Sequence, residues 1–152
     1  MRPPSLLERL LGDSPAEAGR SPRAAADRLR RALAHDIERL LNTRCAWPPE
    51  RLQRWPRAAR SVLALGMPDP AAETGDSLAA RRRIAEHIRH TLCVHEPRLQ
   101  GVRVQALDGR DAAFSIEAAL HHGTDGSGLH FDAEVLPGSR HYAVLPAIGP
   151  RA

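Results

Sequence analysis

An acid and an arginine lie on either side of a proline at residues 96–98. Glu96, Pro97 and Arg98 follow a helix-like stretch and precede a segment whose apolar residues alternate as in a strand. A carboxylate beside a guanidinium can serve as a catalytic acid with its helper, as an ion pair that fixes the chain, or as a contact for another protein. The three possibilities differ in the other residues that they require.

Glycoside hydrolysis is the first chemistry that Glu96 suggests. A glycosidase needs two carboxyl groups, one kept protonated by an apolar pocket and one ionised. Arg98 favours the ionised form of Glu96, which is the opposite of what a general acid requires. The sequence singles out no partner carboxylate either. We therefore predict no catalytic residues.

Metal binding is the second chemistry to consider. Four side chains of ligating type occur within nine residues: His87, His90, Cys93 and His95. On a helix Cys93 and His95 point in different directions, and the paired spacings typical of zinc sites are missing. We interpret the group as exposed helix histidines with one buried cysteine, and the histidines at 121–122 as solvated. Nucleotide-binding and hydrolase motifs are also missing, so we expect no metal site and no cofactor.

Arginine supplies all 22 basic residues, and the formal net charge is +4. Runs at 28–31 and 81–83 resemble nucleic-acid contacts, but no aromatic residues that could stack on bases are interleaved with them. Runs of this kind are typical of solvated helix faces, and arginine is suited to gripping carboxylates on an acidic protein. We expect protein partners and no nucleic acid.

The composition, 42% hydrophobic and 26% charged, is typical of a soluble globular chain. The two cysteines, Cys45 and Cys93, form no C-x-x-C motif, which favours a reducing compartment. No apolar run has the length of a signal peptide core or of the roughly 20-residue span that crosses a membrane. We expect a cytoplasmic protein without membrane insertion.

Two stretches have the apolar spacing of amphipathic helices. In residues 23–42 and 77–94 apolar side chains recur every three or four positions, and Pro97 should end the second helix. The expected inward-facing residues are Leu29, Leu33, Ile37, Leu40 and Leu41 in the first helix, and Leu78, Ile84, Ile88, Thr91 and Leu92 in the second.

A shorter amphipathic pattern at 5–11 is followed by turn-forming residues at 13–22. We interpret the first as a helical arm and the second as a linker. The predicted domain organisation is an arm and linker at 1–22 and one domain at 23–152.

After Pro97 the hydrophobic period changes to two, which predicts strands. Turn-forming sequences at 107–111, 124–128 and 137–140 should separate them. The alternating apolar residues are Val102, Val104 and Ala106; Phe114, Ile116, Ala118 and Leu120; Leu129, Phe131, Ala133 and Val135; and Tyr142 with Val144. We predict an α+β fold, with two main helices packed on one face of a mostly antiparallel four-stranded sheet.

Several short motifs occur in an order that resembles one known family. They are S-L-L-E-R-L near the start, D-I-E-R-L-L-N-T-R at 36–44, S-V-L-A-L-G-M-P-D at 61–69, H-E-P-R-L at 95–99 and L-H-F-D-A-E-V at 129–135. The chain resembles the lysozyme-related baseplate family, which includes TssE of type VI secretion systems and the small wedge protein at the base of contractile phage tails. It departs from the pattern at His95, where the family has an aromatic residue, and at Met67, where it has leucine.

The resemblance implies a structural subunit and no enzymatic activity. Family members join the wedge subunits TssF, TssG and TssK in a sixfold baseplate. They resemble the strand-exchanging domain of the sheath and can template its first ring, which TssB and TssC build. The family's E-P-R motif corresponds to Glu96, Pro97 and Arg98, the predicted partner-binding residues. The alternatives are an intramolecular latch without a partner, and a peptidoglycan hydrolase acting locally on the cell wall.

Overall fold

The computed structural model describes residues 22–52, 54–68, 77–107, 112–121, 128–147 and 149. Two long helices, α2 (Pro22–Asn42) and α4 (Leu78–His95), precede the sheet. Between them lie a short helix, α3 (Pro49–Leu52), and two 3₁₀ turns, η1 (Ala58–Arg60) and η2 (Val62–Ala64). The proposed arm at 5–11 and residues 13–21 of the linker predicted at 13–22 lie outside the described residues, and residue 22 is the first residue of α2.

The second half of the chain forms one antiparallel sheet. Its strands are β1 (Leu99–Ala106), β2 (Ala113–Leu120), β3 (Leu129–Val135) and β4 (Tyr142–Ala147), and they lie side by side in chain order. The register pairs Ile116 with Val104 on one side and with Phe131 on the other. The predicted α+β class and antiparallel meander are confirmed. Of the three predicted turns, only 137–140 lies fully within the described residues, and it joins β3 to β4.

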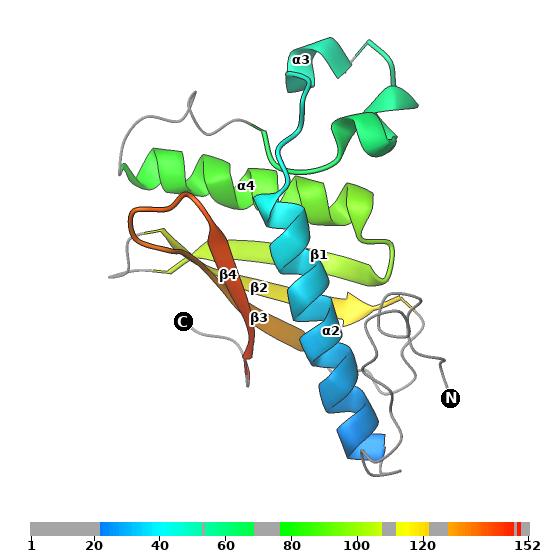
Figure 1. The fold of residues 1–152 in the computed structure, drawn as a ribbon, viewed down its shortest axis with the longest axis vertical. Helices are drawn as coiled ribbons and strands as arrows, with labels where there is room; N and C mark the ends of the chain where they lie inside the picture. The colour runs from blue at the N-terminus through cyan, green and yellow to red at the C-terminus, as the bar shows by residue number, and fades with distance from the viewer. Residues whose placement is uncertain are drawn as a thin grey trace.

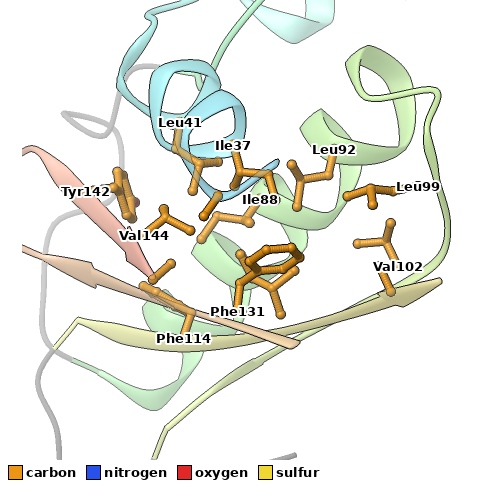
Figure 2. Packing of buried hydrophobic residues seen from close by; sticks show 14 of the residues in the cluster. Ile37, Leu41, Ile88, Leu92, Leu99, Val102, Phe114, Phe131, Tyr142 and Val144 are labelled. Atoms are coloured by element: carbon orange, nitrogen blue, oxygen red, sulfur yellow. The ribbon is translucent and has the colours of Figure 1, made fainter. Parts of the chain in front are cut away.

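The core lies between the sheet and the two long helices. Figure 1 shows α2 and α4 running in different directions across the same side of the sheet, and Figure 2 shows their apolar side chains meeting those of the strands. Each large apolar side chain that is fully buried contributes about 1.5–3 kcal/mol to stability. The largest fully buried side chains are Phe114, Phe131, Leu33, Ile37, Leu41, Ile88, Leu92 and Ile116.

The ends of α4 follow from local chemistry. Ser77 caps its first turn, because the hydroxyl oxygen accepts a hydrogen bond from the backbone N–H of Ala80 at 3.1 Å. The helix ends at His95, two residues before Pro97, which cannot continue a helix. Pro97 therefore stops the helix as predicted and brings β1 directly under it.

Three expectations about α4 were wrong, and the first is that its histidines are exposed, since His87 and His95 are half-buried. Leu78 was expected to face the core, but it is 52% exposed because it is the first residue of the helix, ahead of the turns that contact the sheet. Cys93 was expected to be buried, but it is exposed. The buried residues of α4 are Ala80, Ala85, Ile88, Thr91 and Leu92.

A backbone turn at Gly66 is hydrogen-bonded to the residues that follow the end of α2. The N–H of Met67 donates to the carbonyl of Thr43 at 2.8 Å, and the N–H of Cys45 donates to the carbonyl of Met67 at 2.9 Å. Gly66 has a φ of +103°, and a Cβ there would lie 2.3 Å from the Thr43 oxygen. Only glycine fits this position, which gives the glycine of the G-M-P-D sequence a structural reason.

Candidate functional site

The predicted site residues lie in the turn between α4 and β1. The N–H of Glu96 still donates to the carbonyl of Leu92 at 2.9 Å, as in the last turn of a helix, and the N–H of Leu99 donates to the carbonyl of Glu96 at 3.1 Å. These bonds close a tight turn around Pro97. The backbone therefore holds Glu96 and Arg98 close to each other on one side of the junction.

The Glu96 carboxylate is bound by the Arg98 side chain through both of its oxygens. Nε of Arg98 donates to Oε1 at 2.6 Å and Nη2 donates to Oε2 at 2.5 Å, while the backbone N–H of Arg98 donates to Oε1 at 3.2 Å. The Glu96 side chain is only 9% exposed. A two-pronged pair of this kind is among the stronger hydrogen-bonded ion pairs in proteins.

A third residue, Asp36 of α2, completes the cluster. Its Oδ2 accepts a hydrogen bond from Nη2 of Arg98 at 2.6 Å, although the two residues are 62 positions apart in the chain. Sequence reasoning missed Asp36 as a site residue. Two signals pointed to it: it opens the D-I-E-R-L-L-N-T-R motif at 36–44, and it lies one residue before the buried Ile37, at the border of the apolar face of α2.

The electrostatics of this cluster, Asp36–Glu96–Arg98, favour a charged guanidinium. The hydrogen bonds from Arg98 to Glu96 raise the pKa of Arg98, the partial burial of its side chain opposes this, and the hydrogen bond to Asp36 adds to the rise. The Arg98 side chain is 26% exposed and that of Asp36 is 37% exposed, and Pro97 is exposed. The cluster thus joins α2 to the α4–β1 turn and presents an accessible rim to other molecules.

Strand β4 forms one edge of the sheet, and α2 covers its outward backbone groups. The amide of Asn42 accepts from the N–H of Tyr142 at 2.8 Å and donates to the carbonyl of the same residue at 2.9 Å. The carboxylate of Glu38 accepts from the N–H of Val144 at 2.9 Å. The next outward position is Pro146, which has no N–H. The β4 edge therefore offers no free N–H to an added strand.

Strand β1 forms the opposite edge, and it is open. The N–H of Leu107 donates to the carbonyl of Ala113 at 2.9 Å. Because hydrogen-bonded and non-bonded pairs alternate in an antiparallel ladder, Val104 and Ala106 turn their backbone groups away from β2. Within the part of the chain that the structure describes, nothing pairs with these outward groups. An exposed edge of this kind is a template for strand addition.

The other residues considered from the sequence do not converge on a site. His95 lies on the side of α4 that faces η2, and its Nε2 donates to the carbonyl of Ala64 at 2.9 Å. Burial lowers the pKa of His95. His87 is half-buried and His90 is exposed, and the described residues contain no group of three metal-ligating side chains. His121 is exposed, and His122 lies outside the described residues.

No described helix is both long enough and apolar enough to cross a membrane.

The arginine runs at 28–31 and 81–83 lie on α2 and α4. One of them, Arg30, pairs with Asp27 of the same helix turn at 3.3 Å.

Comparison with known proteins gives a family match over the region that contains Asp36, Glu96 and Arg98. No curated protein matches the chain. The family model described as baseplate wedge protein gp25 matches residues 27–124, which include α2 from its sixth residue onward, all of α4 and the residues of the cluster. This match covers more than half of the chain, so the chain belongs to the baseplate wedge protein gp25 family.

Proposed function

We propose that this chain is a structural subunit of a type VI secretion baseplate, working in the cytoplasm. Membership of the gp25 family supports a structural role in a baseplate and contact with other baseplate components. In this proposal the chain joins the wedge subunits TssF, TssG and TssK. It then templates the first ring of the contractile sheath, which TssB and TssC build.

The observation that carries the sheath part of the proposal is the difference between the two sheet edges. Glu38, Asn42 and Pro146 close the β4 edge, whereas Val104 and Ala106 leave the β1 edge open. Proteins usually protect an edge strand from unwanted pairing. One edge of this sheet is protected and the opposite edge is open, which suits the addition of a neighbour's strand to the open edge. A sheath subunit that exchanges strands would supply such a strand, and we propose β1 as the edge that receives it.

Glu96, Pro97 and Arg98 take the second role in the proposal, contact with a neighbouring subunit. The Arg98–Glu96 and Arg98–Asp36 ion pairs hold the turn in one shape before a partner arrives. A pre-organised turn loses less conformational entropy on binding than a mobile one. The exposed Pro97 ring and the accessible part of Arg98 form the contact.

A non-enzymatic role also agrees with the geometry at Glu96. Both oxygens of the carboxylate are bound by the guanidinium of Arg98, so neither oxygen is free to hand a proton to a substrate as a general acid must. The proposal therefore predicts that purified protein does not clear a peptidoglycan suspension. Lysis that disappears in Glu96→Gln would favour a hydrolase and contradict the proposal.

The proposal is tested by co-purification and by sheath formation in cells. Glu96→Ala, Arg98→Ala and Pro97→Ser should each reduce recovery of TssF, TssG and TssK and reduce sheath assembly. Pro97→Ser is the sharpest of the three because it removes an exposed ring and no ion pair. If all three variants accumulate normally and still recover the wedge subunits and build sheaths, the contact role is wrong. If Pro97→Ser behaves normally and only the two charge variants are degraded, the cluster is an intramolecular latch.

A further inference from the structure

Both tryptophans of the chain lie on the surface of one small lobe. The tryptophan lobe (residues 46–64) contains α3, η1 and η2 and connects α2 to α4. Trp47 is 43% exposed and Trp55 is 67% exposed, and the neighbouring Val62 and Leu63 are exposed as well. A single exposed apolar residue is ordinary, but several large ones within one short segment mark an interaction surface.

The fold explains why these side chains stay outside the core. Prolines at 48, 49 and 56 interrupt the segment, which is limited to one short helix and two 3₁₀ turns. Figure 1 shows α3 and the 3₁₀ turns on the side of α4 that faces away from the sheet. Among the side chains of the lobe that the structure describes, no apolar one joins the hydrophobic core cluster.

The exposed side chains surround a shallow hollow of about 620 Å³. Its walls are apolar at Trp47, Trp55 and Leu63, and basic at Arg51 and Arg54. A hollow of this size accepts one or two large side chains of a partner, and aromatic residues with arginine are the residue types that contribute most to binding at protein interfaces.

The charge of the lobe is strongly one-sided. Residues 46–64 contain four arginines and a single acidic residue, Glu50. The guanidinium of Arg51 lies 5.9 Å from the centre of the Trp47 ring, a cation–π contact. Elsewhere in the chain Arg30 and Arg89 pair with acids on their own helices. Among the acids whose side chains the structure describes, none pairs with the four arginines that the lobe carries: Arg51, Arg54, Arg57 and Arg60.

We propose that the tryptophan lobe binds an acidic segment of a partner protein. Apolar side chains of that segment fill the hollow between Trp55 and Leu63, and its carboxylates pair with Arg51 and Arg54. A second copy of this chain is a poor occupant, because two arginine-rich lobes would repel each other. Single-stranded nucleic acid is disfavoured because the Arg51 guanidinium already lies 5.9 Å from the centre of the Trp47 ring, and Leu52, Ala58 and Leu63 line the hollow where further stacking rings would be needed.

Selecting peptides from a random library on the purified full chain identifies which residue types the tryptophan lobe binds. A random peptide library built without tryptophan is panned on the protein. Binding of the selected peptides is then followed by the fluorescence of Trp47 and Trp55, the only tryptophans present. We expect enriched peptides to combine several acidic residues with large apolar ones, and their affinity to fall as salt is added. Selection without an acidic bias, or no enrichment at all, overturns the proposal.

Matched variants locate the binding. Arg54→Gln should weaken the selected peptides about ten-fold, as should Trp55→Ala when binding is measured by calorimetry. Leu145 and Arg31, two exposed residues outside the lobe, serve as controls. Leu145→Ala and Arg31→Gln should bind the peptides like the wild type. Equal weakening by lobe and control variants overturns the proposal, as does tighter binding of oligo(dT) than of any peptide. Deletion of residues 1–21 should leave the affinity unchanged, and a ten-fold gain would make the chain's own first residues the occupant.

Discussion

Replacing Arg98 by methionine tests the account of the Asp36–Glu96–Arg98 cluster most sharply. The substitution keeps much of the apolar stem of the side chain but removes the guanidinium that binds both oxygens of Glu96. The carboxylate, only 9% exposed, keeps one hydrogen bond at 3.2 Å from the backbone N–H of residue 98. It is therefore left nearly buried and without a countercharge.

The expected cost follows from this burial. Removing one partner of a buried ion pair typically costs about 3–5 kcal/mol. Because the Arg98 side chain is itself 26% exposed, water can reach part of the vacated space, so we expect about 3 kcal/mol, at the lower end. Asp36 is 37% exposed, so Asp36→Asn should cost no more than about 1 kcal/mol, as for a surface ion pair.

A double-mutant cycle separates the pair from its surroundings. Glu96→Gln alone should cost about 2 kcal/mol, and the Glu96→Gln, Arg98→Met double variant about 3 kcal/mol, because it leaves no buried charge. The single costs then exceed the cost of the double by about 2 kcal/mol, which is the coupling between the two side chains.

Urea unfolding followed by circular dichroism measures each of these free energies. With a typical slope near 1.5–2 kcal/mol per molar urea, Arg98→Met should lower the midpoint by about 1.5–2 M. A cost below about 1 kcal/mol for Arg98→Met, or single costs that simply add in the double variant, would refute the claim that the pair holds the junction together.

Three further predictions concern the fold around the site. Gly66→Ala should destabilise the protein by about 3 kcal/mol in the same urea assay, because its Cβ would meet the Thr43 oxygen at a backbone conformation that alanine rarely adopts; a cost below 1 kcal/mol would contradict this. Asn42→Ala should cost about 2 kcal/mol, because it leaves the outward N–H and C=O of Tyr142 unpaired, and unchanged stability would mean that water replaces the amide. For His95, burial lowers the pKa in the folded state from its ordinary 6.5, so the unfolded chain binds protons first. Stability should therefore decline as the pH falls below about 6.5; His95→Gln should flatten this decline, and an identical pH profile in the variant would contradict the assignment.

The helices and strands could be predicted because the spacing of apolar residues along the chain encodes each of them. The three- and four-residue spacing placed α2 and α4, the alternation after Pro97 placed the strands, and Pro97 itself marked the end of α4. The exposure of Leu78 and Cys93 was not predictable in the same way. A helical pattern gives the direction of a face but not how far the sheet extends beneath it.

Only part of the Asp36–Glu96–Arg98 cluster could be predicted from the sequence. Glu96 and Arg98 could be paired from their spacing, but the contact with Asp36 spans 62 positions, and the contacts of Glu38 and Asn42 with β4 span about 100. Such contacts depend on how α2 lies across the sheet, which no local pattern records. The closed β4 edge and the open β1 edge follow from the same packing.

The open edge of β1 gives the most direct test of the proposed function. Ala106→Pro removes one outward N–H and leaves the bonds of β1 to β2 in place, since an edge strand tolerates proline where the N–H faces outward. The matched control is Pro146→Ala, which adds an N–H to the closed β4 edge. In cells, Ala106→Pro should still recover the wedge subunits but assemble few sheaths, while Pro146→Ala should assemble them normally. Normal sheath assembly with Ala106→Pro would contradict templating through β1.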